Sequence, residues 1–288
     1  MKKALTPIVR LIPPVPDQRD ESVISYYPRE EVNGPFMHPQ LFTIGDVVIY
    51  SYGVFVTLGF IAAVVSFLWE IKRRDDSLWI GVDILLLMIP AGLIGAKAFH
   101  VLFSLSDYQE GPHTLVSTIF SGWSAAGGLL GSLAFLIIYF KRKGLDGWYW
   151  MDTLIPSVPL AQTFMRVGCT MAGCCYGKPT DLPWAITFTE SAVAPLGVPL
   201  HPTQIYHLAA NFLIYLLLVI RRNRTAFTGE LTLAYVLLYT IQRSVIDVFR
   251  ADPGRLWFWD TITTYQLIGA VAVFVVIILH KSRIGSGS

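Results

Sequence analysis

Apolar segments of nearly membrane-spanning length recur along this 288-residue chain. A helix needs roughly 20 consecutive apolar residues to cross the hydrocarbon core of a bilayer. With 53% apolar and 15% charged residues, the composition suits a chain that is mostly embedded in lipid. We therefore predict an all-α polytopic membrane protein with seven transmembrane helices, at about 50–71, 82–103, 122–140, 151–173, 203–220, 230–249 and 262–280.

The remaining segments have compositions that disfavour long helices. Residues 1–36 contain six prolines, five Lys/Arg and five Asp/Glu, and we interpret them as an extended N-terminal arm. The rest of the chain, 37–283, forms one membrane domain, which opens with an extended or interfacial lead-in over 37–50. The long, proline-containing connection at about 174–202 predicts a small extracytoplasmic head between spans four and five, with a short hairpin as one form. Residues 284–288 have the Gly/Ser composition of an added tail.

The distribution of positive charge predicts the orientation. Eleven Lys/Arg residues follow spans one, three, five and seven, whereas three lie in the connections on the opposite side. Because cytoplasmic loops carry the excess of Lys and Arg, the C-terminus is expected in the cytoplasm and the N-terminus outside. The net charge of +2, spread over loops, gives no reason to expect nucleic acid as a partner.

Three cations are predicted at similar depth in the outer half of the membrane. Spans two, four and six run outward, so Lys97, Arg166 and Arg243 lie roughly 20 to 24 Å above their cytoplasmic entry points at a rise of about 1.5 Å per residue. Ionisable residues inside a membrane are costly and usually functional. The anion available in the outer leaflet is a phospholipid phosphate, which the planar fork of arginine suits well.

The sixth span carries a polar stripe. Tyr239, Arg243, Asp247 and Arg250 fall at i, i+4, i+8 and i+11, so that Asp247 can orient both arginines. One interpretation is a phosphate site. The alternative is that these charges lock helices together through salt bridges.

The small residues and thiols allow more than one interpretation. Gly127 and Gly128 permit close approach of either another helix or a ligand. Cys169, Cys174 and Cys175 suit a buried apolar role, a disulfide, or a reactive or metal-binding thiol site. Their C-x4-C-C spacing matches no standard zinc finger, and we predict no metal. We expect His201 and His207 to be hydrogen-bonding residues rather than ligands.

Taken together, these motifs resemble those of one family, the bacterial prolipoprotein diacylglyceryl transferases. The resemblance extends over about residues 38–280. It is carried by Leu41-Phe-Thr-Ile-Gly, Tyr52-Gly53, Gly95-Ala-Lys97, Gly127-Gly-Leu-Leu-Gly131, Asp152, Arg166-Val-Gly168, Gly173 to Gly177, His201-Pro-Thr-Gln-Ile-Tyr206, and Tyr239, Arg243 and Arg250 with Asp252-Pro253.

The resemblance implies a multi-pass enzyme of the bacterial cytoplasmic (inner) membrane, acting as a monomer and without a cofactor. It would transfer the diacylglyceryl group of phosphatidylglycerol to the lipobox cysteine thiol of a prolipoprotein, releasing glycerol phosphate. Arg166 and Arg243 would bind the phosphate and stabilise the leaving group, and Tyr239 would act with them. The resemblance assigns substrate binding to Tyr52, Lys97, Gly127, Gly128, Gly168, Gly177, His201, Gln204, Tyr206, Asp247 and Arg250.

The sequence also departs from the family pattern. Ala126 stands where the family has a histidine, and Cys169 and Cys174 stand where it has asparagine and glutamate. His207 follows the His-Pro-Thr-Gln-Ile-Tyr motif where the family has glutamate. These departures leave three alternatives: a related transferase with another acceptor, a non-catalytic phospholipid-binding protein, and a thiol-redox membrane protein.

Overall fold

The computed structural model describes residues 38–44, 47–103, 124–189, 191 and 193–251, the backbone of 255–256 and 259–263, and the isolated positions 271 and 274. The chain divides into two compact units. The first takes the described residues within Met1–Ala62, Val158–Asn223 and Leu233–Ser288, and the second is Ala63–Ser157 with Arg224–Thr232. Helix α2, Ser51–Arg73, begins in the first unit and ends in the second.

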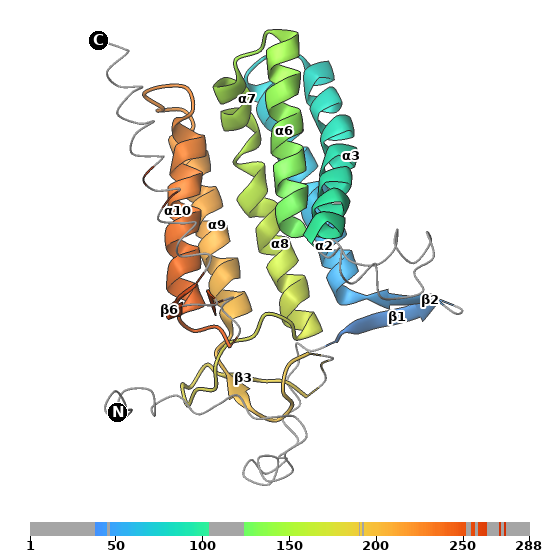
Figure 1. Ribbon diagram of the computed structural model, residues 1–288, viewed down its shortest axis with the longest axis vertical. Helices are drawn as coiled ribbons and strands as arrows, with labels where there is room; N and C mark the ends of the chain where they lie inside the picture. The colour runs from blue at the N-terminus through green and yellow to red at the C-terminus, as the bar shows by residue number, and fades with distance from the viewer. Residues whose placement is uncertain are drawn as a thin grey trace, which may run out of the picture. The chain divides into compact units, whose positions relative to one another are not determined.

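The second unit is built on a close helix pair. Helices α3, Leu78–Phe103, and α6, Ala125–Lys143, run side by side (Figure 1). A Cβ placed on Gly95 would lie 2.5 Å from the carbonyl oxygen of Gly127 and 2.7 Å from the Cα of Gly131. Small residues of this kind let the backbones of membrane helices approach closely. At least at Gly127, the glycines serve a helix contact, one of the two roles considered for them.

The core of the second unit joins four helices. Phe67 and Ile71 of α2 pack with Ile84 of α3, Leu136 of α6 and Trp150 of the short helix α7, Gly147–Leu154. The segment 224–232 is tied to α7 by a buried carboxylate, Asp152, which accepts hydrogen bonds from Gly229 N, Thr232 N and Thr232 Oγ1 at 2.7, 2.9 and 2.7 Å.

The first unit starts with an antiparallel hairpin of β1, Gln40–Ile44, and β2, Val47–Tyr50, which leads directly into α2. Its other helices are α8, Ser157–Ala172, α9, Thr203–Arg221, and α10, Glu230–Asp247. Buried amides join α9 to α10, where Gln242 Nε2 donates to Asn211 Oδ1 at 2.7 Å. The hydroxyl of Tyr235 on α10 donates to Gln162 Oε1 on α8 at 3.2 Å.

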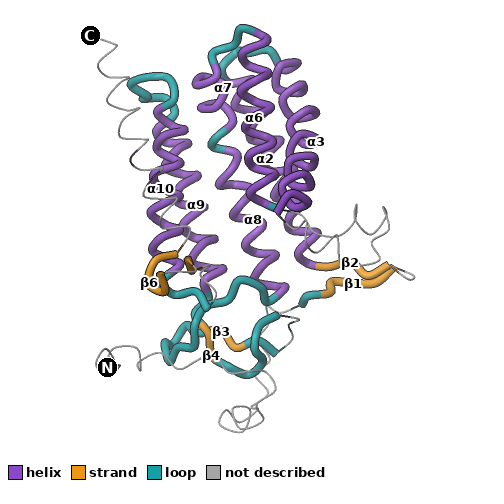
Figure 2. Tube along the Cα trace, in the orientation of Figure 1, coloured by secondary structure: helices purple, strands orange, loops and turns teal. Residues whose placement is uncertain are grey.

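The connection between α8 and α9 has its own small core. Strands β3, Ile186–Thr187, and β4, Pro199–Leu200, pair antiparallel, as Figure 2 shows among the loops. Phe188, Ala194, Val198 and Leu200 are buried together beside this pair. A further antiparallel pair, β5, Arg255–Leu256, and β6, Trp259–Thr263, follows α10. The hairpin considered for the connection is present.

The described helices agree with most of the predicted spans. Helices α2, α3 up to Leu102, and α9 are long and apolar enough to cross a membrane. Helices α6 and α10 cover most of the third and sixth predicted spans. The protein is therefore a mainly helical membrane protein. The N-terminal arm and the seventh predicted span lie outside the described residues, except for the start of that span in β6 and the isolated positions 271 and 274.

The fourth predicted span needs a correction. It was predicted as one helix over 151–173, but two turn residues, Ile155 and Pro156, separate α7 from α8. Proline has no backbone N–H, and its ring clashes with the preceding turn, so it kinks or breaks a helix; here the helix breaks. The functional residues of the predicted span are carried by α8 alone.

Candidate functional site

Asp247, the last residue of α10, forms ion pairs with both arginines of the predicted stripe, although Arg250 lies beyond the end of the helix. Asp247 is almost fully buried, with 1% of its surface exposed. Its Oδ1 lies 3.2 Å from the Nε of Arg243 and 3.7 Å from the Nε of Arg250. A buried carboxylate between two guanidinium groups fixes their orientation, because moving either away would leave the carboxylate poorly compensated.

Helices α8 and α9 bring two further groups to these arginines. Arg166 of α8 has a buried Nε without a hydrogen-bond partner in the described part of the chain. His207 of α9 is 1% exposed and lies within electrostatic reach of Arg166, Arg243 and Arg250. Its Nε2 is 3.4 Å from Arg243 Nη1. Three guanidinium groups therefore converge around one buried histidine, and we call these four residues the arginine cluster.

Two of the three predicted cations, Arg166 and Arg243, lie in this cluster, and a binding role for Lys97 stays a prediction. Arg166 and Arg243 share the first unit, whereas Lys97 on α3 belongs to the second, together with Gly127 and Gly128. His207 was expected only to form hydrogen bonds. The signal that marks its importance is its position four residues after Thr203 and three after Gln204, on the face of α9 that is buried.

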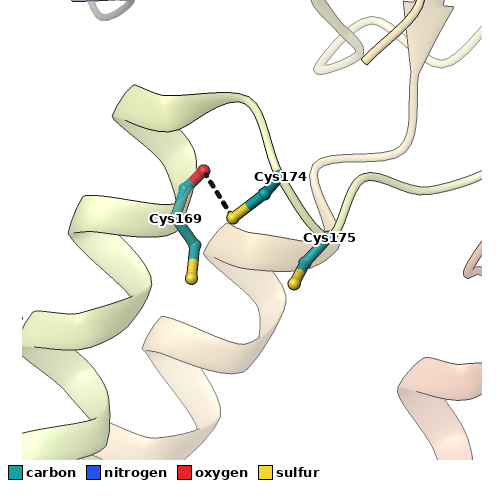
Figure 3. A group of neighbouring side chains, drawn as sticks. All are labelled: Cys169, Cys174 and Cys175. Carbon is teal, nitrogen blue, oxygen red and sulfur yellow. Dashed lines mark hydrogen bonds between the residues drawn. The ribbon is translucent and has the colours of Figure 1, made fainter. Parts of the chain in front are cut away.

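The three cysteines come together at the end of α8. Their sulfur atoms all lie within 4.8 Å of one another, and all three thiols are free. Cys169 is in the last turn of α8, while Cys174 and Cys175 follow Gly173 in the loop; the Cys174 thiol donates to Cys169 O at 3.8 Å (Figure 3). We call this group the thiol cluster. Of the three, Cys169 is the buried one, with 4% exposed.

Two left-handed residues make this convergence possible. Gly173 has φ of +69° and Cys175 has φ of +59°. The left-handed region is costly for a residue with a Cβ, so such a residue persists only where the surroundings hold it. At Gly173 the turn also reverses the chain after α8, which returns the next two thiols towards Cys169.

The start of α9 supplies that support. Thr203 Oγ1 donates to Cys175 O at 2.6 Å, and Gln204 Nε2 donates to Cys174 O at 2.7 Å. Both donor residues are fully buried. The His-Pro-Thr-Gln-Ile-Tyr motif thus clamps the cysteine loop, a contact that the sequence did not predict for Gln204.

Electrostatics within the thiol cluster favour one anionic sulfur. Hydrogen bonds from the Cys169 and Cys174 thiols lower the pKa of Cys175, and the nearby Arg250 and Arg166 act in the same direction. Hydrogen bonds with the Cys169 and Cys175 thiols, and then burial, raise the pKa of Cys174. A thiolate is the nucleophilic and metal-binding form of cysteine.

His201 and Tyr206, at the two ends of the His-Pro-Thr-Gln-Ile-Tyr motif, belong to a group of aromatic side chains. His201 Nδ1 lies 3.3 Å from Tyr206 Oη, which accepts a hydrogen bond from Trp184 Nε1 at 2.9 Å. The ring of His201 also packs on Phe249, with centroids 5.1 Å apart. Burial, and then the charge of Lys178, lower the pKa of His201.

The glycines and tyrosines assigned by resemblance have identifiable neighbours. A Cβ on Gly168 would meet Phe55 Cβ at 3.1 Å and Tyr52 Cα at 3.2 Å, so this glycine allows α2 to pack on α8. A Cβ on Gly177 would lie closer still, 2.6 Å from the carbonyl oxygen of His201. Tyr52 is 43% exposed and lies within electrostatic reach of Arg166 and the three thiols.

Tyr239, the third residue assigned to catalysis, stacks on Tyr235 with ring centroids 5.6 Å apart. It lies one turn before Arg243 on α10. An apolar helical protein with arginines, tyrosines and thiols gathered in one unit defines a class: helical membrane proteins with charged side chains inside the fold.

Comparison with known proteins identifies the family within that class. The family model described as prolipoprotein diacylglyceryl transferase matches residues 39–281. The chain belongs to this family.

Several curated relatives have the name phosphatidylglycerol–prolipoprotein diacylglyceryl transferase. The protein of Clostridium tetani is 33% identical, over 83% of this chain and 97% of its own length. The relative from Dehalococcoides mccartyi strain 195 is 32% identical over 85% and 94%, and that of Finegoldia magna is 30% identical over 83% and 93%.

Proposed function

We propose that this chain transfers the diacylglyceryl group of phosphatidylglycerol to the lipobox cysteine thiol of a prolipoprotein, releasing glycerol phosphate. Membership of the family and the names of the curated relatives support this activity. The observation that carries it is the convergence of Arg166, Arg243 and Arg250 around His207.

In this reaction the acceptor sulfur attacks the glycerol carbon that bears the phosphate. The C–S bond forms as the C–O bond to phosphate breaks, and the leaving glycerol phosphate keeps the electron pair. Arg166 and Arg243 bind the phosphate oxygens and stabilise the charge that develops on them. Hydrogen-bond donors that already point at the position of this developing charge lower the activation barrier, because they need not reorient during the reaction.

The two arginines are prepared for this task in different ways. Arg243 is oriented by its ion pair with Asp247. Substitution of Asp247 would remove this ion pair and let the guanidinium group move. Arg166 has a buried Nε that lacks a partner among the described residues, and a phosphate oxygen is a suitable acceptor. Tyr239 and Tyr52 orient the lipid through their hydroxyl groups.

The proposed topology has seven transmembrane helices, with the N-terminus outside, the C-terminus in the cytoplasm, and residues 174–202 as an extracytoplasmic head. The excess of Lys and Arg after the odd-numbered spans supports this orientation. We place the enzyme in the bacterial cytoplasmic membrane, as a monomer that needs no cofactor for phosphate recognition.

The test uses purified full-length protein with phosphatidylglycerol and a lipobox peptide, followed by mass spectrometry of the peptide. Arg166→Ala and Arg243→Ala should each slow transfer by about 10²- to 10³-fold, the usual effect of removing one donor to a developing charge. Arg142→Ala, at an exposed position near the end of α6 in the other unit, is the matched control and should keep the rate. Failure of the unsubstituted protein to modify the peptide would contradict the proposed acceptor.

A second candidate is a transferase of the same kind with a different acceptor. The thiol cluster favours it, because cysteines stand at two positions of the signature where the family has asparagine and glutamate. A panel of thiol and hydroxyl acceptors distinguishes the two. Phosphatidylglycerol bound without turnover on any acceptor would instead indicate a lipid-binding protein.

A further inference from the structure

The thiol cluster has the composition of a metal site with one coordination position left open. Cys169, Cys174 and Cys175 are the only cysteines of the chain, and their sulfurs lie within 4.8 Å of one another. Figure 3 shows the three side chains grouped at the end of α8, with the Cys174 sulfur directed towards the carbonyl of Cys169. Zinc with Zn–S bonds of about 2.3 Å and tetrahedral geometry requires sulfurs about 3.8 Å apart. Sulfurs within 4.8 Å of one another need to come at most about 1 Å closer to reach that spacing.

The number of ligands distinguishes a catalytic from a structural site. Structural zinc sites in proteins have four protein ligands, whereas catalytic ones have three and keep the fourth position for water or substrate. This chain has no fourth cysteine. His207 lies near Cys175, yet its ring nitrogens are not within the 4.8 Å group of the three sulfurs. Among the described residues no His, Asp or Glu joins the three sulfurs, so within that part of the chain the fourth position is open to a ligand from outside.

The surroundings suit an anionic metal–thiolate centre. Arg166 and Arg250 lie within electrostatic reach of Cys175. Three thiolates around Zn²⁺ carry one net negative charge, which nearby guanidinium groups stabilise. The loop that carries two of the thiols is held by Thr203 and Gln204, whose bonds to it come from fully buried side chains. Partners outside the ligand set often orient metal ligands in this way.

The proposed reaction supplies a reason for a metal here. The acceptor thiol must become a thiolate before it can attack carbon. Asp247 is held by two arginines, and His207 lies among three guanidinium groups, so neither is a good base for that proton. A metal ion deprotonates a coordinating thiol outright.

We propose that Cys169, Cys174 and Cys175 bind one zinc ion as three thiolates, and that its open position binds and ionises the acceptor thiol. This inference rests on the proposed transferase function. The acceptor loses its proton to solvent on binding zinc. Its sulfur then attacks the glycerol carbon of the lipid, the C–O bond to phosphate breaks, and the thioether product leaves zinc because thioethers are weak ligands. The reaction involves no oxidation or reduction.

Cobalt binding tests the metal site independently of activity. The full-length protein is reduced, freed of metal and reductant without oxygen, and titrated with Co²⁺. One equivalent should bind with sulfur-to-cobalt charge-transfer absorption and the ligand-field bands of tetrahedral cobalt, and Zn²⁺ should displace it. Cys174→Ser and Cys175→Ser should remove the charge-transfer absorption. His100→Gln, on α3 in the other unit, is the control and should retain it.

A measurement on the unsubstituted protein tests the site even if a cysteine variant fails to fold. Zinc should protect all three thiols from alkylation, as counted by mass spectrometry of the intact protein. Absence of sulfur-to-cobalt absorption in a protein whose three thiols are free overturns the site. A disulfide between two of the cysteines in freshly purified protein also overturns it, in favour of a redox pair.

The transfer assay tests the role of the metal in catalysis. At pH 7 an ordinary thiol with a pKa near 8.5 is about 3% ionised, so removing zinc should slow transfer about 30-fold from ionisation alone. The rate of the zinc-free enzyme should rise with pH up to that pKa, while the zinc-loaded rate stays flat. Equal rates and pH profiles with and without zinc overturn the catalytic role and leave the proposed function intact. Absence of transfer by the zinc-loaded enzyme, despite cobalt binding, contradicts the proposed function itself.

Discussion

The hydrogen bonds from Thr203 and Gln204 to the cysteine loop, which we call the clamp, can be tested by substituting Thr203. In Thr203→Val the side chain keeps its shape but loses the hydroxyl that donates to Cys175 O at 2.6 Å. Thr203 is fully buried, so the carbonyl loses a donor that water cannot easily replace. Leaving a buried acceptor unsatisfied costs about 1–3 kcal/mol. Because valine is close to threonine in volume, we expect little further cost from a cavity.

This cost should appear as easier local opening of the loop. Cys169 has 4% of its surface exposed, and its carbonyl accepts hydrogen bonds from Cys174 of the loop, so we expect a reagent to reach its thiol mainly when the loop opens. If opening and closing are fast compared with alkylation, the rate follows the population of the open form. At about 0.6 kcal/mol for RT, a loss of 1–3 kcal/mol corresponds to alkylation of Cys169 roughly 5- to 150-fold faster.

The assay is iodoacetamide alkylation of the reduced, metal-free protein, with each cysteine quantified by peptide mass spectrometry. The matched control is Thr232→Val, which removes another buried hydroxyl, the 2.7 Å donor to Asp152 Oδ1 in the second unit. The control should leave Cys169 alkylation unchanged. Equal acceleration by both variants would refute local control by the clamp, and no acceleration by Thr203→Val would refute the clamp itself.

Three further predictions address the electrostatics. Arg166→Lys should recover only part of the transfer lost in Arg166→Ala, because lysine offers a point charge rather than a planar fork; initial rates at saturating lipid measure this. Asp247→Asn should destabilise the protein by about 3–5 kcal/mol, since it breaks a buried pairing with Arg243 and Arg250, and a thermal unfolding midpoint equal to that of the parent would contradict the prediction. Because its pKa is lowered by the neighbouring thiols, Cys175 should lose less of its rate with iodoacetamide between pH 8 and pH 6 than an ordinary thiol, which slows by about 75-fold over that range; an equal loss would contradict the prediction.

The helices of this chain could be predicted because each depends on its own residues. Apolar length alone located α2, α3 and α9, and the spacing along α10 gave the ion pairs of Asp247. Pro156 lies at the break before α8, but Pro90 lies inside α3 without ending it, so a proline alone does not fix where a helix ends. The prediction of one helix over 151–173 was wrong because it relied on the apolar length of this segment and gave Pro156 too little weight.

The site was harder to predict because it depends on backbone states that residue type does not dictate. Cys175 has a positive φ, which few residues with a Cβ adopt, and without that turn the C-x4-C-C spacing does not bring three sulfurs together. Thr203 and Gln204 stabilise the turn from a helix about 30 residues later in the chain. Sequence spacing contains no record of such a contact.

The arginine and thiol clusters share charges, which constrains the order of events in the site. Arg166 lies within electrostatic reach of both His207 and Cys175, so it acts on whichever anion is present. Phosphate bound to the arginines would weaken their support for thiolates, and thiolates would weaken phosphate binding by the same factor, because such coupling is reciprocal.

Zinc changes this balance, since it reduces the net negative charge of the three thiolates from three to one. A metal-loaded cluster could therefore hold the lipid phosphate and an ionised acceptor together, whereas a metal-free cluster would favour one at the expense of the other. Phosphatidylglycerol affinity measured with and without zinc distinguishes these cases: zinc should tighten lipid binding. Equal affinity would show that the two clusters act independently, and weaker binding with zinc would contradict the charge argument.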